Sequence, residues 1–214
     1  MHIFISPFLI AMLFFATILP THAENDFDIA EGIEYEVLDQ IQPVNNKDKV
    51  QVIEFFSYAC PHCYNLEPNV LAWLKNKPGN IDFIQVPAIF NKQWEAFAKI
   101  YYTAEILNVA DKVHPLIFEA IHGTGKKISS LDDIKTIFTS NGISSESFDN
   151  TLKSFAVANK IRKSKAMTKN YNIKSVPMII VQGKYRTDST LAHGHKNVFK
   201  VVDHIIKQIK NKDE

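Results

Sequence analysis

Cysteine is scarce in this sequence, and its placement excludes two common uses of the residue. The 214 residues contain two cysteines, Cys60 and Cys63. A disulfide between them would close a loop of only four residues, which removes little entropy from the unfolded chain, so the pair is a poor structural staple. A structural zinc site usually needs four ligands, and the sequence has no second cysteine pair to supply them. The spacing therefore indicates redox chemistry.

Arginine is scarce relative to lysine, since two of the 24 basic residues are arginines. Residues 24–150 carry 10 Lys and 19 Asp or Glu, whereas residues 151–214 carry 14 basic and 4 acidic side chains. We expect these oppositely charged parts to attract each other in the folded chain. The basic run from Lys160 to Lys174 has one aromatic residue, Tyr171, that could stack on a base. We interpret the run as the solvated face of a helix and expect no nucleic-acid partner.

Beyond the first 23 residues, the sequence lacks an apolar run long enough to span a membrane. Residues 3–19 are almost all apolar and uncharged, and residues 21–23 place small side chains where an export peptidase reads them. We predict a signal peptide over residues 1–23, cleaved after Ala23, and no integral membrane segment in the mature chain. The alternative is an uncleaved anchor, but a run this short with Pro7 inside it is marginal for a hydrocarbon core of about 30 Å.

The order of the expected elements predicts an α/β fold with an insertion. Val50–Phe56 is a buried strand, residues 60–77 form a helix, and residues 81–86 form a second strand, which together indicate parallel strands joined by a helix. Residues 94–170 are expected to be helical throughout. Strand character returns at 178–181 and 184–187, joined by a tight turn, before a final helix. We predict one α/β domain from residues 24–90 and 171–214, interrupted by a helical insertion at 91–170.

Cys60 follows the first of these strands and opens the helix after it. The unpaired N–H groups and the partial positive charge of a helix N-terminus stabilise a thiolate. Pro61 suits the first helical turn, and His62 can add a hydrogen bond or a positive charge. These effects predict a pKa for Cys60 below the usual value of about 8.5. Cys63, one turn further into the helix, is expected to be buried and to act as the resolving thiol.

A proline directly before the third strand is the second signal. Val176-Pro177 precedes Met178, at a place where proline is unusual. A cis Val176–Pro177 bond would place the main chain of Val176 against the disulfide and offer an edge to a substrate chain.

The segment from Phe55 to Tyr64, which contains Cys-Pro-His-Cys, resembles the active-site segment of the DsbA family. Val176-Pro177 and the later Gly183-Lys184-Tyr185 also resemble that family. The resemblance implies a thioredoxin fold with an inserted helical domain and a periplasmic role in making disulfides in exported proteins.

The resemblance also assigns roles to residues. It makes Cys60 the attacking cysteine, Cys63 the resolving one, Val176-Pro177 the cis-proline loop, and Glu54 a buried acid that shuttles the proton of the inner cysteine. Some relatives carry a basic partner for that acid where this chain has Gln85. Without it, Glu54 is expected to be protonated more often.

The expected partners are unfolded exported proteins with free cysteines and a DsbB-type membrane quinone reductase, with no cofactor and no resident metal. Three alternatives remain. The first alternative is a disulfide isomerase or reductase of the same compartment. The second is a carrier that holds copper or zinc through Cys60 and Cys63, and the third is a relative of the glutathione-dependent isomerases. The export signal and the intact cysteine pair speak against the last.

Among the remaining residues, Trp94 is explained by core packing as well as by the resemblance. His193 and His195 lack the neighbouring cysteines or paired carboxylates that a metal site would need. His114 and His122 are expected to be surface or helix-cap residues.

Overall fold

The computed structural model describes His2 and residues 28–44, 46, 48–125, 128 and 130–213. The expected signal peptide lies outside these residues apart from His2, so it stays a prediction. Within the part of the chain that the structure describes, no helix combines the length and apolar character needed to cross a membrane.

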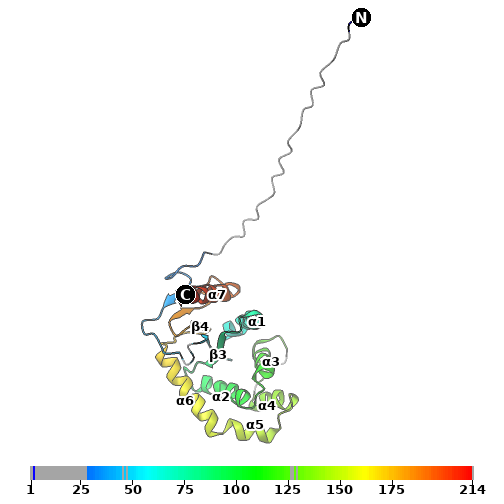
Figure 1. Ribbon diagram of the computed structural model, residues 1–214. Helices are drawn as coiled ribbons and strands as arrows, with labels where there is room; N and C mark the ends of the chain where they lie inside the picture. Colours follow the sequence, from blue (N-terminus) through cyan, green and yellow to red (C-terminus); the bar gives the residue numbers. More distant parts are fainter. Residues whose placement is uncertain are drawn as a thin grey trace.

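A five-stranded mixed sheet lies at the centre of the fold (Figure 1). Its strand order is β1-β5-β4-β2-β3. β2 and β3 run parallel, whereas β2 with β4, β4 with β5, and β5 with β1 are antiparallel. The predicted parallel pair and the predicted hairpin are both confirmed. The strands are β1 Glu36–Val37, β2 Val50–Phe56, β3 Ile81–Pro87, β4 Met178–Val181 and β5 Tyr185–Thr187.

The central strand β2 is buried along its whole length. Because side chains alternate between the two faces of a sheet, Val52 and Phe56 share one face and Ile53 and Phe55 the other. Val52 belongs to the apolar cluster that also holds buried residues of α1 (Pro61–Asn76) and α7 (His195–Asp213). Glu54 shares the face of Val52, so its carboxyl group points into the protein on the side of α1.

α1 connects the two parallel strands and carries the cysteine pair at its start. Pro61 is its first residue, where the missing N–H costs no hydrogen bond. Leu66, Val70 and Trp73 are buried at helical spacing. The helix continues past Pro68 to Asn76 as one segment.

The long helical region of the sequence is five separate helices between β3 and β4. They are α2 Lys92–Ile106, α3 Ala110–His122, α4 Leu131–Ser140, α5 Ser145–Leu152 and α6 Phe155–Asn170. Side-chain caps start four of them, at Asn91, Ser130, Ser144 and Ser154. These helices share an apolar core that includes Ile117, Phe138 and Phe148 and extends to Phe56 at the end of β2 and to Cys63 of α1. Figure 1 shows this helical part below the sheet, with α7 on the opposite side.

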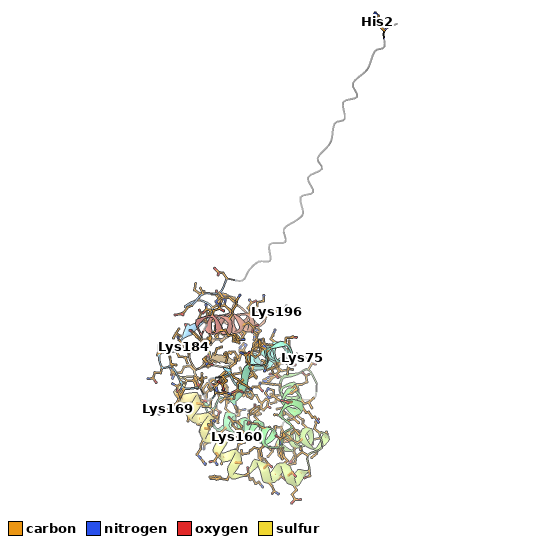
Figure 2. The ribbon with its side chains drawn as sticks, in the orientation of Figure 1. His2, Lys75, Lys160, Lys169, Lys184 and Lys196 are labelled. Atoms are coloured by element: carbon orange, nitrogen blue, oxygen red, sulfur yellow. The ribbon has the colours of Figure 1, made fainter. Side chains whose placement is uncertain are left out.

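The basic run of the sequence covers the outer side of α6 and the loop after it. Figure 2 shows Lys160 and Lys169 on this helix, at the flank of the molecule. Lys160 forms an ion pair with Glu105 of α2, with 2.8 Å between nitrogen and oxygen. Lys165 pairs in the same way with Glu95 of α2, also at 2.8 Å. Opposite charges from the acidic and basic parts of the chain therefore meet between α2 and α6, as expected.

Candidate active site

Cys60 occupies the N-cap of α1, directly after the loop that follows β2. Its backbone N–H donates to the carbonyl oxygen of Ser57 at 3.0 Å, and its own carbonyl oxygen accepts from the backbone of Cys63 at 3.1 Å. The side chain of Cys60 keeps 8% exposure, whereas Cys63 is fully buried. Both cysteines are free thiols in the structure. The arrangement therefore presents one sulfur to an incoming thiol and holds the other behind it.

The two thiols have opposite acidities. The pKa of Cys60 is lowered to about 6, first because the Cys63 thiol donates a hydrogen bond to its sulfur. The backbone N–H groups of Cys63 and His62 and the charge of His62 lower the pKa further, against the opposing effect of burial. For Cys63, burial above all raises the pKa well above its usual value, and the hydrogen bond to Cys60 adds to this. The helix terminus and His62 were expected to act on Cys60, but the larger contribution of Cys63 was not.

The loop before β4 meets the cysteine pair from the other half of the chain. The Val176–Pro177 peptide bond is cis, as predicted. The thiol of Cys60 donates to the carbonyl oxygen of Val176, with 3.4 Å between sulfur and oxygen. Val176 is half-buried and Pro177 is buried. The fold thus brings together the two motifs that the sequence places 116 residues apart.

Glu54 is 1% exposed on β2. In the register of the two parallel strands it lies opposite Gln85 of β3, and the side-chain amide of Gln85 donates to a Glu54 carboxylate oxygen at 2.9 Å. The pKa of Glu54 is raised to about 8, first by burial and then by the negative charge of Glu67, while the hydrogen bond from Gln85 opposes both effects. The expectation that Glu54 faces Gln85 and holds its proton more readily therefore agrees with the geometry.

The prediction that His114 lies at the surface or caps a helix is wrong. Its side chain is buried in the middle of α3. One ring nitrogen shares a hydrogen bond of 2.7 Å with the hydroxyl group of Tyr58. The other lies 3.4 Å from a Glu67 carboxylate oxygen and 3.3 Å from the side-chain nitrogen of Gln85. His114 therefore belongs to the polar group around Glu54.

Glu67 was also missed, although the sequence contains a signal for it. Glu67 follows Cys63 by four residues, so on a helix it faces the same side as Cys63 and next to the buried Val70. The structure leaves only 6% of it exposed. A carboxylate at that spacing, on the buried side of α1, needs a partner inside the protein, and His114 supplies one.

The remaining residues singled out in the sequence make contacts outside the polar group around Glu54. Trp94, at the start of α2, packs against Phe90 with 4.8 Å between ring centroids. His122, in the last turn of α3, donates to the carbonyl oxygen of Tyr58 at 2.7 Å. His193 lies 3.2 Å from a Glu34 carboxylate oxygen, and His195 begins α7.

Disulfide exchange proceeds by attack of a thiolate, and in this pair Cys60 ionises readily while Cys63 does not. The fold and this pair of thiols define the chain as a thiol–disulfide oxidoreductase.

Comparisons with known proteins identify the family. Residues 80–206 match the family model described as DSBA-like thioredoxin domain. The chain is 35% identical over 196 residues to the thiol:disulfide interchange protein DsbA of Pseudomonas syringae pv. tomato, covering 92% of both chains. It is 37% identical over 192 residues to that of Azotobacter vinelandii, covering 89% of this chain and 90% of the relative. The crystal structure of Pseudomonas aeruginosa DsbA has a TM-score of 0.79 at 32% identity, covering 89% of this chain and 98% of that one.

The chain therefore belongs to the DSBA-like thioredoxin domain family. Its fold is the thioredoxin fold with an inserted helical domain, as the resemblance implied.

Proposed function

We propose that this protein donates a Cys60–Cys63 disulfide to folding exported proteins in the periplasm. The observation that carries the proposal is the position of Cys60 at the N-cap of α1, where the Cys63 thiol and backbone N–H groups lower its pKa to about 6. A thiolate exists only in the reduced protein, so every interaction that stabilises it favours the reduced state. The oxidised protein is then driven to give its disulfide away.

The first step begins with a thiolate of the substrate protein. It attacks the sulfur of Cys60, a mixed disulfide forms, and the bond between the sulfurs of Cys60 and Cys63 breaks. The sulfur of Cys63 leaves with the electron pair of that bond and takes up a proton. Glu54 is the proposed proton donor, because its pKa of about 8 keeps it mostly protonated at neutral pH.

The second step releases the oxidised substrate. A second thiolate of the substrate attacks the substrate sulfur of the mixed disulfide, and Cys60 departs as a thiolate. A thiol of low pKa is a good leaving group, so this step is fast. Two electrons have then moved from the substrate to the protein, which ends as a dithiol.

The Val176-Pro177 loop is the proposed contact for the substrate chain. The carbonyl oxygen of Val176 lies 3.4 Å from the sulfur of Cys60. A peptide joined to Cys60 would therefore pass beside the main chain of Val176, where backbone hydrogen bonds can align it without regard to its sequence. This suits an enzyme that acts on many unfolded proteins.

The compartment and the reoxidant complete the proposal. Residues 1–23 have the pattern of an export signal, and a protein that donates disulfides needs an oxidising compartment. After each turnover the dithiol must lose two electrons, and we propose a DsbB-type membrane quinone reductase as their acceptor.

The test is the oxidation of a reduced, unfolded protein by the oxidised enzyme. We expect rapid disulfide formation in the substrate and complete loss of activity in Cys60→Ser. Cys63→Ser should be inactive as well, because without the second thiol Cys60 cannot carry a disulfide to donate. Retained activity in Cys60→Ser would contradict the assignment of the attacking cysteine.

A second substrate separates the oxidase from the isomerase alternative. A protein with scrambled disulfides should be corrected slowly, since an oxidising pair tends to leave the mixed disulfide before rearrangement. Efficient correction together with weak oxidation of the reduced substrate would move the function to isomerisation.

A further inference from the structure

A buried polar cluster joins the sheet to the inserted helices behind the cysteine pair. We define the acid cluster as Glu54 of β2, Glu67 of α1, Gln85 of β3, His114 of α3 and Tyr58 of the loop before α1. Its two carboxyl groups and its imidazole belong to Glu54, Glu67 and His114, which are 1%, 6% and 4% exposed. Buried ionisable groups are costly unless they are paired, so their gathering at one place needs a reason.

The contacts form a continuous path through the cluster. Gln85 donates to Glu54 at 2.9 Å and lies 3.3 Å from a ring nitrogen of His114. The same nitrogen is 3.4 Å from Glu67, and the other ring nitrogen is 2.7 Å from the hydroxyl oxygen of Tyr58. Because both ring nitrogens have polar neighbours, the imidazole can carry its proton on either one.

His114 is the basic member of a cluster that contains two carboxyl groups. Glu54 and Glu67 repel each other when both are ionised, and this repulsion contributes to the raised pKa of Glu54. Burial keeps the pKa of Tyr58 well above its usual value, so that hydroxyl group stays neutral. Tyr101 of α2, whose ring centroid is 5.6 Å from that of His114, is likewise held neutral by burial. Among the described residues in these contacts, His114 is the one able to carry positive charge.

The cluster also acts on the resolving thiol. The negative charge of Glu54 contributes to the raised pKa of Cys63, so the two groups interact electrostatically. Cys63 and Glu67 lie one helical turn apart on α1. A change in the protonation of Glu54 is therefore felt at Cys63.

We propose that His114, held between Glu67 and Gln85, is a positioning residue that sets how readily Glu54 exchanges a proton with Cys63. This inference rests on the proposed function, since it assigns Cys63 the resolving step. When the mixed disulfide resolves toward the oxidised enzyme, the thiol of Cys63 gives its proton to the Glu54 carboxylate. The Cys63 thiolate then attacks the sulfur of Cys60, the disulfide forms, and the partner thiolate leaves.

Removing the imidazole of His114 and removing the carboxylate of Glu67 are expected to move the proton exchange of Glu54 in opposite directions. Without the imidazole, the second negative charge in the cluster loses its partner, so the cluster holds its last proton to higher pH. Without the Glu67 carboxylate, Glu54 loses a repelling charge and ionises at lower pH. A nearby charge typically moves a pKa by about one unit or more.

The experiment follows the resolving step across pH. The reduced protein is mixed with glutathione disulfide, samples are quenched in acid, and mass spectrometry records the decay of the Cys60–glutathione adduct from pH 5 to 10. For His114→Asn we expect the midpoint of the rate profile to rise by about one pH unit. For Glu67→Gln we expect it to fall. In both variants the ionisation of Cys60, read from thiolate absorbance, should keep its midpoint.

A matched control lies on the same helix. His122 is two turns beyond His114 on α3 and contacts the carbonyl oxygen of Tyr58, but it has no recorded contact with the carboxyl groups of the acid cluster among the described residues. His122→Asn should therefore leave the midpoint of the resolving step where it is. A shift in this control equal to that of His114→Asn would show a general effect of α3 and would overturn the proposal.

Two outcomes distinguish a failure of the role of His114 from a failure of the proposed function. If the unmodified protein resolves the adduct but His114→Asn and Glu67→Gln keep its midpoint, or move it in the same direction, the role of His114 is disproved. If the unmodified protein does not resolve the adduct at all, the proposed function fails. Glu67→Gln preserves the shape of the side chain, so this variant tests the role of the contact between His114 and Glu67 even if His114→Asn does not fold.

Discussion

At the scale of single residues, the site depends on two cysteines with the same chemistry and different surroundings. Cys60 lies at the start of α1, next to the Cys63 thiol and backbone N–H groups, and these lower its pKa to about 6. Cys63, three residues later, is enclosed by the protein, and its pKa rises. The difference gives each sulfur one role in disulfide exchange.

The lowered pKa of Cys60 makes a prediction about stability. A thiol whose pKa is lower in the folded protein adds stability above its ordinary pKa and loses that stability as pH falls through the folded value. We expect the free energy of unfolding of the reduced protein, minus that of the oxidised protein, to increase between pH 6 and pH 8. The slope is at most about 1.4 kcal/mol per pH unit. Urea unfolding of both forms measures it, and a difference that stays constant from pH 5 to 8 would contradict the account.

Sequence alone could predict the cysteines, because their spacing and their place after a buried strand are local properties. His114 was missed for a physical reason. Whether a histidine in an amphipathic helix is buried depends on which helix packs against it, and no local pattern records that α3 faces α1. The role of Glu54 came from the resemblance to the DsbA family, and its burial agrees with the apolar strand that carries it.

At the scale of elements, local signals gave most of the secondary structure. Ser130 and Ser144 are serines of the kind that favours a helix N-cap, and their side chains cap the starts of α4 and α5. The bounds of α1 differ by one residue at each end from the predicted 60–77. The region expected to be helical contains five helices, and the chain turns between α2 and α3 at Asn108, whose φ is positive.

The hairpin between β4 and β5 makes a prediction at this scale. Gly183 has a φ of 61°, and a Cβ there would overlap the carbonyl oxygen of Gln42, which belongs to the segment that crosses the turn. We expect Gly183→Ala to destabilise the fold by about 1–3 kcal/mol or more, because backbone strain and overlap add.

Gly79 provides the matched control, since a Cβ at that position would have no atom within 4 Å. Gly79→Ala should leave the urea midpoint nearly unchanged. Equal midpoints for the two variants would show that the turn at Gly183 tolerates a side chain.

At the scale of the whole molecule, the inserted helices are part of the site. α3 supplies His114 to the acid cluster, and the hydroxyl group of Tyr64 on α1 donates to Glu119 of α3 at 2.6 Å. The order of strands and helices predicted the insertion. The acidic residues 24–150 and the basic residues 151–214 meet in the ion pairs between α2 and α6. The boundaries at residues 90/91 and 170/171 stay a prediction.

The most direct test of the account is the redox potential of the Cys60–Cys63 pair, measured by equilibration with glutathione. The low pKa of Cys60 predicts an oxidising pair, with a potential above about −200 mV, more positive than typical glutathione pools. Such a pair gives its disulfide to substrate proteins. A potential near about −270 mV, typical of a reductant, would contradict the proposed role as a disulfide donor.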